Sequence, residues 1–168
     1  EAFVSLSYMR DMNILVIGSA NKPGMYTVSG GSTILSVLHA AGGMNDQGSM
    51  RSIIVKRNNE VLQEVDLYEA LIKGNVNIGT GLRSGDVILI NQKLPQVTIT
   101  GGVPTPAIYE IKPNDSLKNL IELAGGPMPG AFNEIEVRRI MPNKTISILK
   151  VSLDDSENFQ LQNGDSIQ

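Results

Sequence analysis

Hydrophobic residues follow a short pattern that occurs twice in this chain. The first copy is "PGMYTVSGGSTILSVLHAAGG" (Pro23–Gly43) and the second is "PAIYEIKPNDSLKNLIELAGG" (Pro106–Gly126). In each copy a β-rich stretch and a polar break lead to apolar residues spaced i, i+3, i+4, i+7, the spacing of one helix face. These apolar residues are Ile34, Val37, Leu38 and Ala41 in the first copy, and Leu117, Leu120, Ile121 and Ala124 in the second. The pattern predicts two equivalent short helices that each bury one face.

Residues at both ends of each stripe support this prediction. Ser, Thr and Asp side chains accept hydrogen bonds from the first N–H groups of a helix, and glycine adopts the left-handed conformation that ends one. The expected N-caps are Ser32 or Thr33 in the first copy and Asp115 or Ser116 in the second, and the expected stops are Gly42 and Gly125. Each helix therefore has a defined start and end.

Short β-rich runs surround each predicted helix. "NILVIG" and "VTITG" end at glycine and are followed by Pro-x-x-Tyr and a second strand, which indicates a hairpin with a proline-containing loop. After the helix, each copy has one further strand pair: "RSIIVKR" with "EVLQEVD" in the first copy and "EIEVRRI" with "TISILKV" in the second. The turns within these pairs are expected at Asn58-Asn59 and Pro142-Asn143. The first copy adds a short helix, "LYEALIKG", where the second has "DDSE". Each copy closes with a Gly-Asp turn and a last strand.

The repeat extends over nearly the whole chain. Aligning Ile14 with Val97 needs no gap as far as Gly43, and "VKR", "VDL" and "LRSGDVI" then match "VRR", "VSL" and "LQNGDSI" in the same order. The order β-β-α-β-β-(α)-β is that of a small mixed sheet crossed by one helix, the β-grasp arrangement. We therefore predict an α+β fold of two tandem β-grasp units, residues 1–92 (core 13–91) and 93–168 (core 97–168).

We expect a linker at Asn91–Gln96 between the two units. The last strand stops at Gln168, whereas the first copy continues through Leu89–Asn91, and the chain starts at Glu1 without a signal peptide. These features indicate an excised piece of a longer parent protein.

Composition narrows the class of protein. The chain has 168 residues, of which 41% are hydrophobic and 18% are charged, as in ordinary globular domains. A net charge of −3 and a pI of about 5.1 disfavour a nucleic-acid partner. The absence of cysteine excludes a disulfide frame and a cysteine nucleophile, and no apolar run approaches the ~20 residues of a membrane span. With 4% aromatic residues and no Trp, tight stacking on a sugar is disfavoured.

Catalytic, cofactor and metal motifs are missing from the sequence, so we expect no enzyme activity, no cofactor and no metal. His39 is the single histidine, lies outside the helix stripe and aligns with Glu122, which favours a solvated position. "SGGST" (Ser29–Thr33) lacks a Walker lysine and indicates a plain helix entry. We expect "GTG" (Gly79–Gly81) to be a connector. The acidic residues Asp154, Asp155 and Glu157 indicate a solvated loop rather than a calcium site.

Matched basic residues and tyrosines are the candidates for a partner contact: Lys56, Arg57, Arg138, Arg139, Tyr26 and Tyr109. Neighbours on a strand point to opposite faces, so one residue of each basic pair at most faces a given surface. Arginine suits a carboxylate of an acidic polysaccharide or a neighbouring subunit. The alternative is an edge strand that its charges protect from aggregation, and we favour this alternative. We expect both tyrosines to be half-buried packing residues.

The ordered motifs resemble a known family. "G-x-x-x-x-P-G-x-Y-T-V", "S-T-x-L-x-x-L-x-x-A-G-G", "V-K-R", "V-D-L" and "L-x-x-G-D-x-I" are similar to the soluble-ligand-binding β-grasp (SLBB) repeats of outer-membrane polysaccharide export proteins, the Wza-type capsule and exopolysaccharide exporters. The resemblance covers Asn13–Gln168 in two copies. The export segment, lipid-modified cysteine and membrane helix that such exporters usually carry are not found among these motifs.

This resemblance implies a periplasmic scaffold module in an outer-membrane-associated parent protein, which lines or supports an export conduit. The implied partners are the exported polysaccharide, other export-machinery proteins and further copies of the parent, and no nucleic acid. Two alternatives stay open. A small-ligand-binding β-grasp domain, for cobalamin or a saccharide, would need a concave apolar pocket with converging polar groups. Competence-type DNA binding is disfavoured by the acidic balance.

Overall fold

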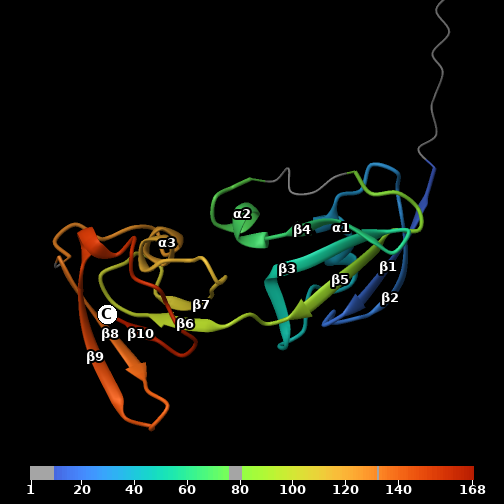
Figure 1. Cartoon of the computed structure of the whole chain (residues 1–168). Coiled ribbons are helices and arrows are strands. Elements are labelled where there is room, and N and C mark those ends of the chain that lie inside the picture. Colours follow the sequence, from blue (N-terminus) through green and yellow to red (C-terminus); the bar gives the residue numbers. More distant parts are fainter. Residues whose placement is uncertain (1–9, 76–80, 132) are drawn as a thin grey trace, which may run out of the picture. The chain divides into compact units, whose positions relative to one another are not determined.

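The computed structural model describes residues 10–75, 81–131 and 133–168. The chain divides into two compact units, residues 1–92 and 93–168, called the first and second unit below. Both units mix strands and helices in the order the sequence predicts (Figure 1). None of the helices in the described ranges is long and apolar enough to cross a membrane.

The first unit is a five-stranded sheet. Its strands lie in the order β2-β1-β5-β3-β4, and β1 and β5 are parallel whereas the other neighbours are antiparallel. The last strand of the unit is therefore its central strand. The elements are β1 (Met12–Gly18), β2 (Gly24–Val28), α1 (Ile34–Ala40), β3 (Gly48–Arg57), β4 (Glu60–Val65), α2 (Leu67–Leu71) and β5 (Val87–Gln92).

The second unit has the same topology. Its sheet order is β7-β6-β10-β8-β9, and β6 and β10 are parallel. A single 3₁₀ turn (Leu153–Asp155) stands where the first unit has α2. The elements are β6 (Gln96–Ile99), β7 (Ala107–Glu110), α3 (Leu117–Leu123), β8 (Glu134–Ile140), β9 (Ile146–Ser152) and β10 (Ser166–Ile167). The predicted α+β fold of two β-grasp units is confirmed.

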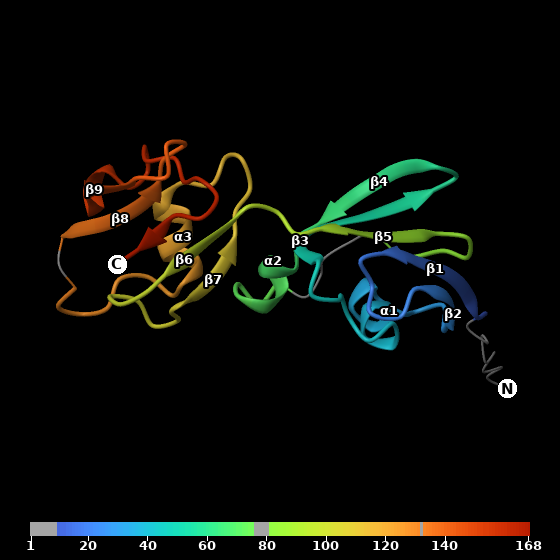
Figure 2. The same ribbon diagram turned by 90° about the horizontal axis from the view of Figure 1, so that it is seen from below.

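The helices α1 and α3 each lie on one face of their sheet, and among the described residues no helix lies on the opposite face (Figure 2). The stripe residues Ile34, Val37, Leu38 and Ala41 are buried against alternate residues of the sheet, such as Ile14 and Ile88. The four stripe residues of α3 are buried in the same way. Each large side chain that leaves water stabilises the unit by ~1.5–3 kcal/mol, so these seven-residue helices owe their stability to the sheet beneath them.

The helix ends match the prediction in both copies. Thr33 and Ser116 are the N-caps, and their side chains accept hydrogen bonds from Ser36 and Asn119 N–H. At the other end, Gly43 N–H donates to Leu38 O at 2.8 Å, and Gly126 N–H donates to Ile121 O at 2.9 Å. Gly42 and Gly125 have positive φ angles of 73° and 97°, which completes a Schellman stop in each unit.

Two features differ from the sequence prediction. β3 and β8 are interior strands, each with a partner on both sides, so their basic residues do not protect an edge. The charge pattern of a strand does not show which strands lie beside it in the sheet. The last strand of each unit is distant in sequence from β3 or β8, yet it pairs with that strand and makes it an interior one. The predicted linker is also shorter: Asn91 and Gln92 belong to β5, and Gln96 begins β6.

Candidate functional site

Arg57 forms an internal ion pair that the sequence did not predict. It ends β3 on the helix-facing side of the sheet, and its Nε and Nη2 atoms lie 2.7 and 2.9 Å from the two carboxylate oxygens of Asp86. Asp86, in the Gly-Asp turn before β5, has a side chain with no exposed surface. It also accepts the Arg83 N–H at 2.7 Å, and Arg57 donates to Gly81 O at 3.2 Å. The pair ties the end of β3 to the turn before the central strand.

Burial on its own would raise the pKa of Asp86. Hydrogen bonds from the Arg57 guanidinium and the Arg83 N–H outweigh that effect and hold the pKa below its usual range. The hydrogen bond to Asp86 in turn raises the pKa of Arg57. Both groups are therefore fully charged near neutral pH, and the pair is a fixed structural clamp.

The second unit contains the same clamp. Arg139 Nε and Nη2 lie 2.9 and 2.7 Å from the Asp165 carboxylate, and Arg139 also donates to Gln160 O at 3.0 Å. Asp165 accepts Gln162 N–H at 2.9 Å, as Asp86 accepts Arg83 N–H. Two of the four predicted basic contact residues are thus occupied inside their own units. The Gly-Asp turn that occurs at the same place in both copies was the sequence signal that could have identified Asp86 and Asp165 as the partners of these arginines.

Lys56 in the first sheet and Arg138 in the second lie on the side of their sheet that faces away from the helix and the clamp. This side of each sheet is called the open face. Arg138 pairs with Glu136 at 2.7 Å. The residue at the position of Glu136 in the first unit is Ile54, so Lys56 lies next to aliphatic side chains and makes no ion pair within the described ranges. These two residues keep their place as candidates for a partner contact.

The two tyrosines have equivalent contacts. Tyr26 OH donates to Lys22 O at 2.6 Å, and Tyr109 OH donates to Thr105 O at 2.8 Å, the carbonyl four residues earlier in each case. Tyr26 is half-buried and Tyr109 is buried, and burial raises the pKa of Tyr109. Each hydroxyl group fastens the proline-containing loop to the second strand of its unit.

The open face of the first sheet is apolar. Residues on β1 and β5 that point away from the helix are in register, with Leu15 beside Val87 and Ile17 beside Leu89. On the neighbouring strands, Met25 is 63% exposed and Val61 is 60% exposed. The aliphatic side chains on this face, all half-buried or exposed, are Leu15, Ile17, Met25, Ile54, Val61, Val87 and Leu89. Large exposed apolar patches are a general feature of interaction sites on proteins.

The open face of the second sheet differs in its central strands. Leu15 and Ile17 of β1 are replaced by Thr98 and Thr100 at the equivalent positions. Ile54, Val87 and Leu89 are replaced by Glu136, Ser166 and Gln168. The buried face and the clamp are the same in both units, so the fold itself does not require the apolar face of the first unit.

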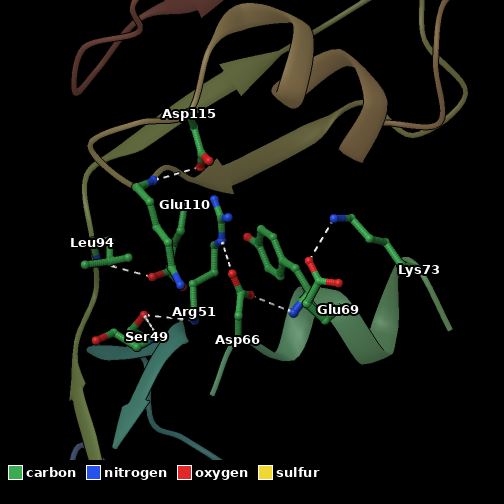
Figure 3. A network of polar contacts seen from close by, with 11 residues as sticks. Ser49, Arg51, Asp66, Glu69, Lys73, Leu94, Glu110 and Asp115 are labelled. Carbon is green, nitrogen blue, oxygen red and sulfur yellow. Dashed lines mark hydrogen bonds and ion pairs between the residues drawn. The ribbon is translucent and has the colours of Figure 1, made fainter. Parts of the chain in front are cut away.

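Figure 3 shows further polar contacts that sequence reasoning missed. In the first unit, Arg51 Nε donates to Asp66 at 3.0 Å, and Asp66 caps α2 by accepting Tyr68 N–H at 3.0 Å. In the second unit, Glu110 accepts Leu94 N–H at 3.1 Å. These side chains fix the start of α2 and the segment that leads into β6.

A pocket of about 460 Å³ opens in the second unit, beside the end of β10. Its walls are mostly apolar and include Ile99, Val103, Ile121 and Ile135 together with the loop 127–131. The polar side chains on its rim belong to Glu134 and Gln168.

The other candidates lie at the surface. His39 is exposed on α1, and Asp154, Asp155 and Glu157 are exposed in their loop, where Glu157 pairs with Lys118 at 3.1 Å. "SGGST" leads into α1 through the Thr33 cap. Within the described residues no group of three or more His, Asp or Glu side chains is placed to hold a metal. Gly79 and Thr80 of the predicted connector lie outside the described residues.

Together, the central last strand, the crossing helix and the duplicated clamp define a tandem β-grasp protein. Comparison with family models gives the particular family. Models of the SLBB domain match residues 12–90 and 96–147, one in each unit. The chain belongs to the SLBB family, as the sequence motifs indicated.

Curated relatives add one further likeness. The chain is 26% identical over 168 residues to the polysialic acid transport protein KpsD of Escherichia coli, for which two sequences match equally. The match covers 99% of this chain and 30% of the relative, so the chain spans less than a third of the length of the curated relatives it matches.

Proposed function

We propose that the chain is a non-enzymatic module of a polysaccharide export protein, in the periplasm and attached to an outer-membrane-associated parent. The likeness to KpsD along almost the entire chain supports the export role, since that relative is a polysialic acid transport protein. The proposed work of the module is assembly and lining of the export conduit. Its partners are the exported polymer, other export proteins and further copies of the parent.

The observation that carries this proposal is the difference between the two open faces. An apolar face is stabilised by contact with another protein surface, because burial removes its side chains from water. On the second open face, the exposed isoleucines Ile108, Ile146 and Ile148 lie on the edge strands β7 and β9. Its central strands carry hydroxyl, amide and charged groups, such as Thr98, Ser166 and Arg138, which suit a hydrated polymer that passes without binding tightly. We assign assembly to the open face of the first unit and polymer contact to that of the second, with Lys56 and Arg138 as the basic contacts.

The test replaces the first face by the residues of the second. Leu15→Thr, Ile54→Glu and Leu89→Gln are introduced together into the parent gene in the bacterium that encodes it. The expected result is a loss of polysaccharide from the cell surface while polymer accumulates inside, because each lost apolar contact costs ~1 kcal/mol or more of association free energy. Surface and internal polymer are quantified separately.

Lys22→Thr is the matched control. It also substitutes the residue of the second unit, Thr105, at an exposed position away from the open face. The control strain should export normally. Normal export by the triple variant would contradict the assembly role, and absence of internal polymer would point instead to an enzyme of polymer synthesis.

The pocket of the second unit favours a second candidate, a small-ligand-binding domain for cobalamin or a saccharide. Its volume falls in the range of about 300–1,000 Å³ that is typical of ligand sites. Its walls offer few polar groups to orient such a ligand. A rise in the thermal unfolding midpoint with a cobalamin or a short oligosaccharide, lost in Ile135→Asp, would favour this candidate over the export module.

A further inference from the structure

Four strands lie at an edge of the two described sheets, and three of them are protected against pairing with another strand. β2 and β7 are five and four residues long, and each follows a proline, Pro23 or Pro106. β4 has a bulge at Leu62 and carries the acidic residues Glu60 and Glu64. Short strands, prolines, bulges and charges are the features by which natural sheets avoid edge-to-edge contacts.

β9 is the fourth edge strand and has almost none of these features. It is seven residues long, contains no proline, glycine or acidic residue, and pairs with β8 without a shift in register. Its single charged residue, Lys150, lies toward one end and pairs with Glu134 at 2.6 Å. The strand therefore presents a long and regular edge.

The exposed side chains along this edge are aliphatic. Ile146 is 67% exposed and Ile148 is 56% exposed, and Ile140, which lies opposite Ile146 on β8, is 68% exposed. The β3–β4 hairpin has no equivalent of the pair formed by Ile140 and Ile146, because it turns at Asn58-Asn59 directly after the clamp arginine. The fold itself does not require this extension of the hairpin.

The backbone of β9 has polar groups that face away from the sheet. At the two ends of its ladder with β8, Met141 N–H donates to Thr145 O at 2.8 Å, and Leu153 N–H donates to Asn133 O at 2.9 Å. Hydrogen-bonded and non-bonded pairs alternate along an antiparallel ladder, so the odd-numbered residues of β9 bond to β8. The N–H and C=O groups of the even-numbered residues, with Ile148 in the middle, point outward and have no partner among the residues that the structure describes.

We propose that β9 pairs with β9 of a second copy of this chain, antiparallel and with Ile148 of each copy at the two-fold axis. The even-numbered residues of both copies then face one another, so their outward N–H and C=O groups bond across the interface. Ile148 lies opposite the partner's Ile148, and Ile146 lies opposite the partner's Lys150. Such a contact uses the same surface on both copies, so it closes as a dimer. This inference does not depend on the export role, because it rests on one edge strand.

The side chains favour this register over its two neighbours. Aliphatic pairs directly opposite each other on two strands are stabilising, and like charges in that position are destabilising. A shift of two residues in one direction would place Lys150 opposite the partner's Lys144. A shift in the other direction would place Ile148 opposite the partner's Lys150 and would leave no isoleucine pair. Of the three registers, the proposed one alone pairs isoleucines without opposing two lysines, and this match of the edge to itself identifies a second copy as the partner.

The first test is amide hydrogen exchange of the full chain, measured residue by residue by NMR at about 0.05 and 1 mM. Interfaces of this size are small, so we expect dissociation constants on the order of 1 mM. The Ile146, Ile148 and Lys150 amides should exchange about twofold more slowly at the higher concentration. The Ser147 and Leu149 amides, which bond to β8, are the internal control and should change little.

Charge variants at Ile148 test the two-fold register. Ile148→Lys and Ile148→Glu each place like charges opposite each other, so each variant alone should diffuse as a monomer at about 1 mM. An equal mixture of the two places lysine opposite glutamate and should associate again. Ile108→Lys is the matched control, because Ile108 is a 62% exposed isoleucine on the other edge of the same sheet. This variant should associate as the unchanged chain does.

Three results would overturn the proposal. The first is equal exchange of the Ile148 amide at both concentrations. The second is a dimer that persists in Ile148→Lys, since a surface elsewhere on the chain would then hold the copies together. The third is a mixture of Ile148→Lys and Ile148→Glu that stays monomeric, which would exclude Ile148 from the two-fold axis.

Discussion

Asp86 and Asp165 are buried carboxylates, each held by one arginine and by one backbone N–H of its own turn. The sequence identified the arginines by their matched positions but assigned them to a surface. The reason is distance along the chain: Arg57 and Asp86 are 29 residues apart, and nothing local in either segment links them. The pairing can be inferred only by comparing the two repeats, because both the arginine and the Gly-Asp turn occur at equivalent positions in each copy.

We predict that Arg139→Ala destabilises the second unit by ~3 kcal/mol. The substitution removes the partner of a carboxylate that has no access to water, and breaking a buried pair on one side costs about that much. Urea unfolding followed by hydrogen exchange of the β8 amides measures the change.

Arg138→Ala is the matched control for this prediction. Arg138 precedes Arg139 in β8, but its ion pair with Glu136 is largely exposed, and such pairs contribute ~0–1 kcal/mol. Similar losses of unfolding free energy in the two variants would show that the Arg139–Asp165 pair does not stabilise the second unit as its geometry indicates.

At the scale of elements, the alternation of apolar residues predicted the strands and helices well. The helix stripes, their caps and the glycine stops depend on neighbours within four residues, so the sequence reports them directly. The order of strands in the sheet depends on where the last strand inserts, and charge pattern gave the wrong answer for β3 and β8. The apolar open face of the first unit can be recognised from the sequence only by comparing the two repeats. Leu15 and Ile17 look like ordinary strand residues until they are compared with their equivalents, Thr98 and Thr100.

Close approach between β1 and β5 leads to a prediction at Gly18. The residue has a φ angle of 81°, and an added Cβ would overlap the Ile90 carbonyl oxygen. Gly18→Ala should therefore destabilise the first unit by more than ~2 kcal/mol, through left-handed strain of ~1–2 kcal/mol and the loss of the hydrogen bond from Ser19 to Ile90. Thermal unfolding and exchange of the Ser19 amide report both effects.

Gly101→Ala provides the comparison for Gly18→Ala. Its φ angle of 66° carries the same kind of strain, but its Cβ would meet only Gln168 Cγ, at an ordinary contact distance of 3.7 Å. It should cost only the strain, ~1–2 kcal/mol. If both alanines cost the same, the contact with Ile90 does not determine the requirement for glycine.

At the scale of the whole molecule, we predict that residues 10–92 and 93–168, made as separate chains, each unfold cooperatively. Each contains its own sheet, helix and clamp, although units of this size bury only ~60% of their unfolded surface and are marginal alone. Circular dichroism with urea measures the two midpoints. A fragment that stays unfolded in buffer would show that the division lies elsewhere or that the units need each other.

The position of the last strand has a consequence for the order of events when the protein is made. In the first unit, the hairpins β1-β2 and β3-β4 contact each other in the sheet only through β5, which comes last in the chain. A chain that emerges amino-terminal end first therefore carries two separate hairpins until residues 87–92 follow, and the sheet then closes in a single non-local step. Until that step β1 and β3 each lack the neighbour that β5 provides, so the five-stranded sheet cannot form before the last residues of the unit have been made.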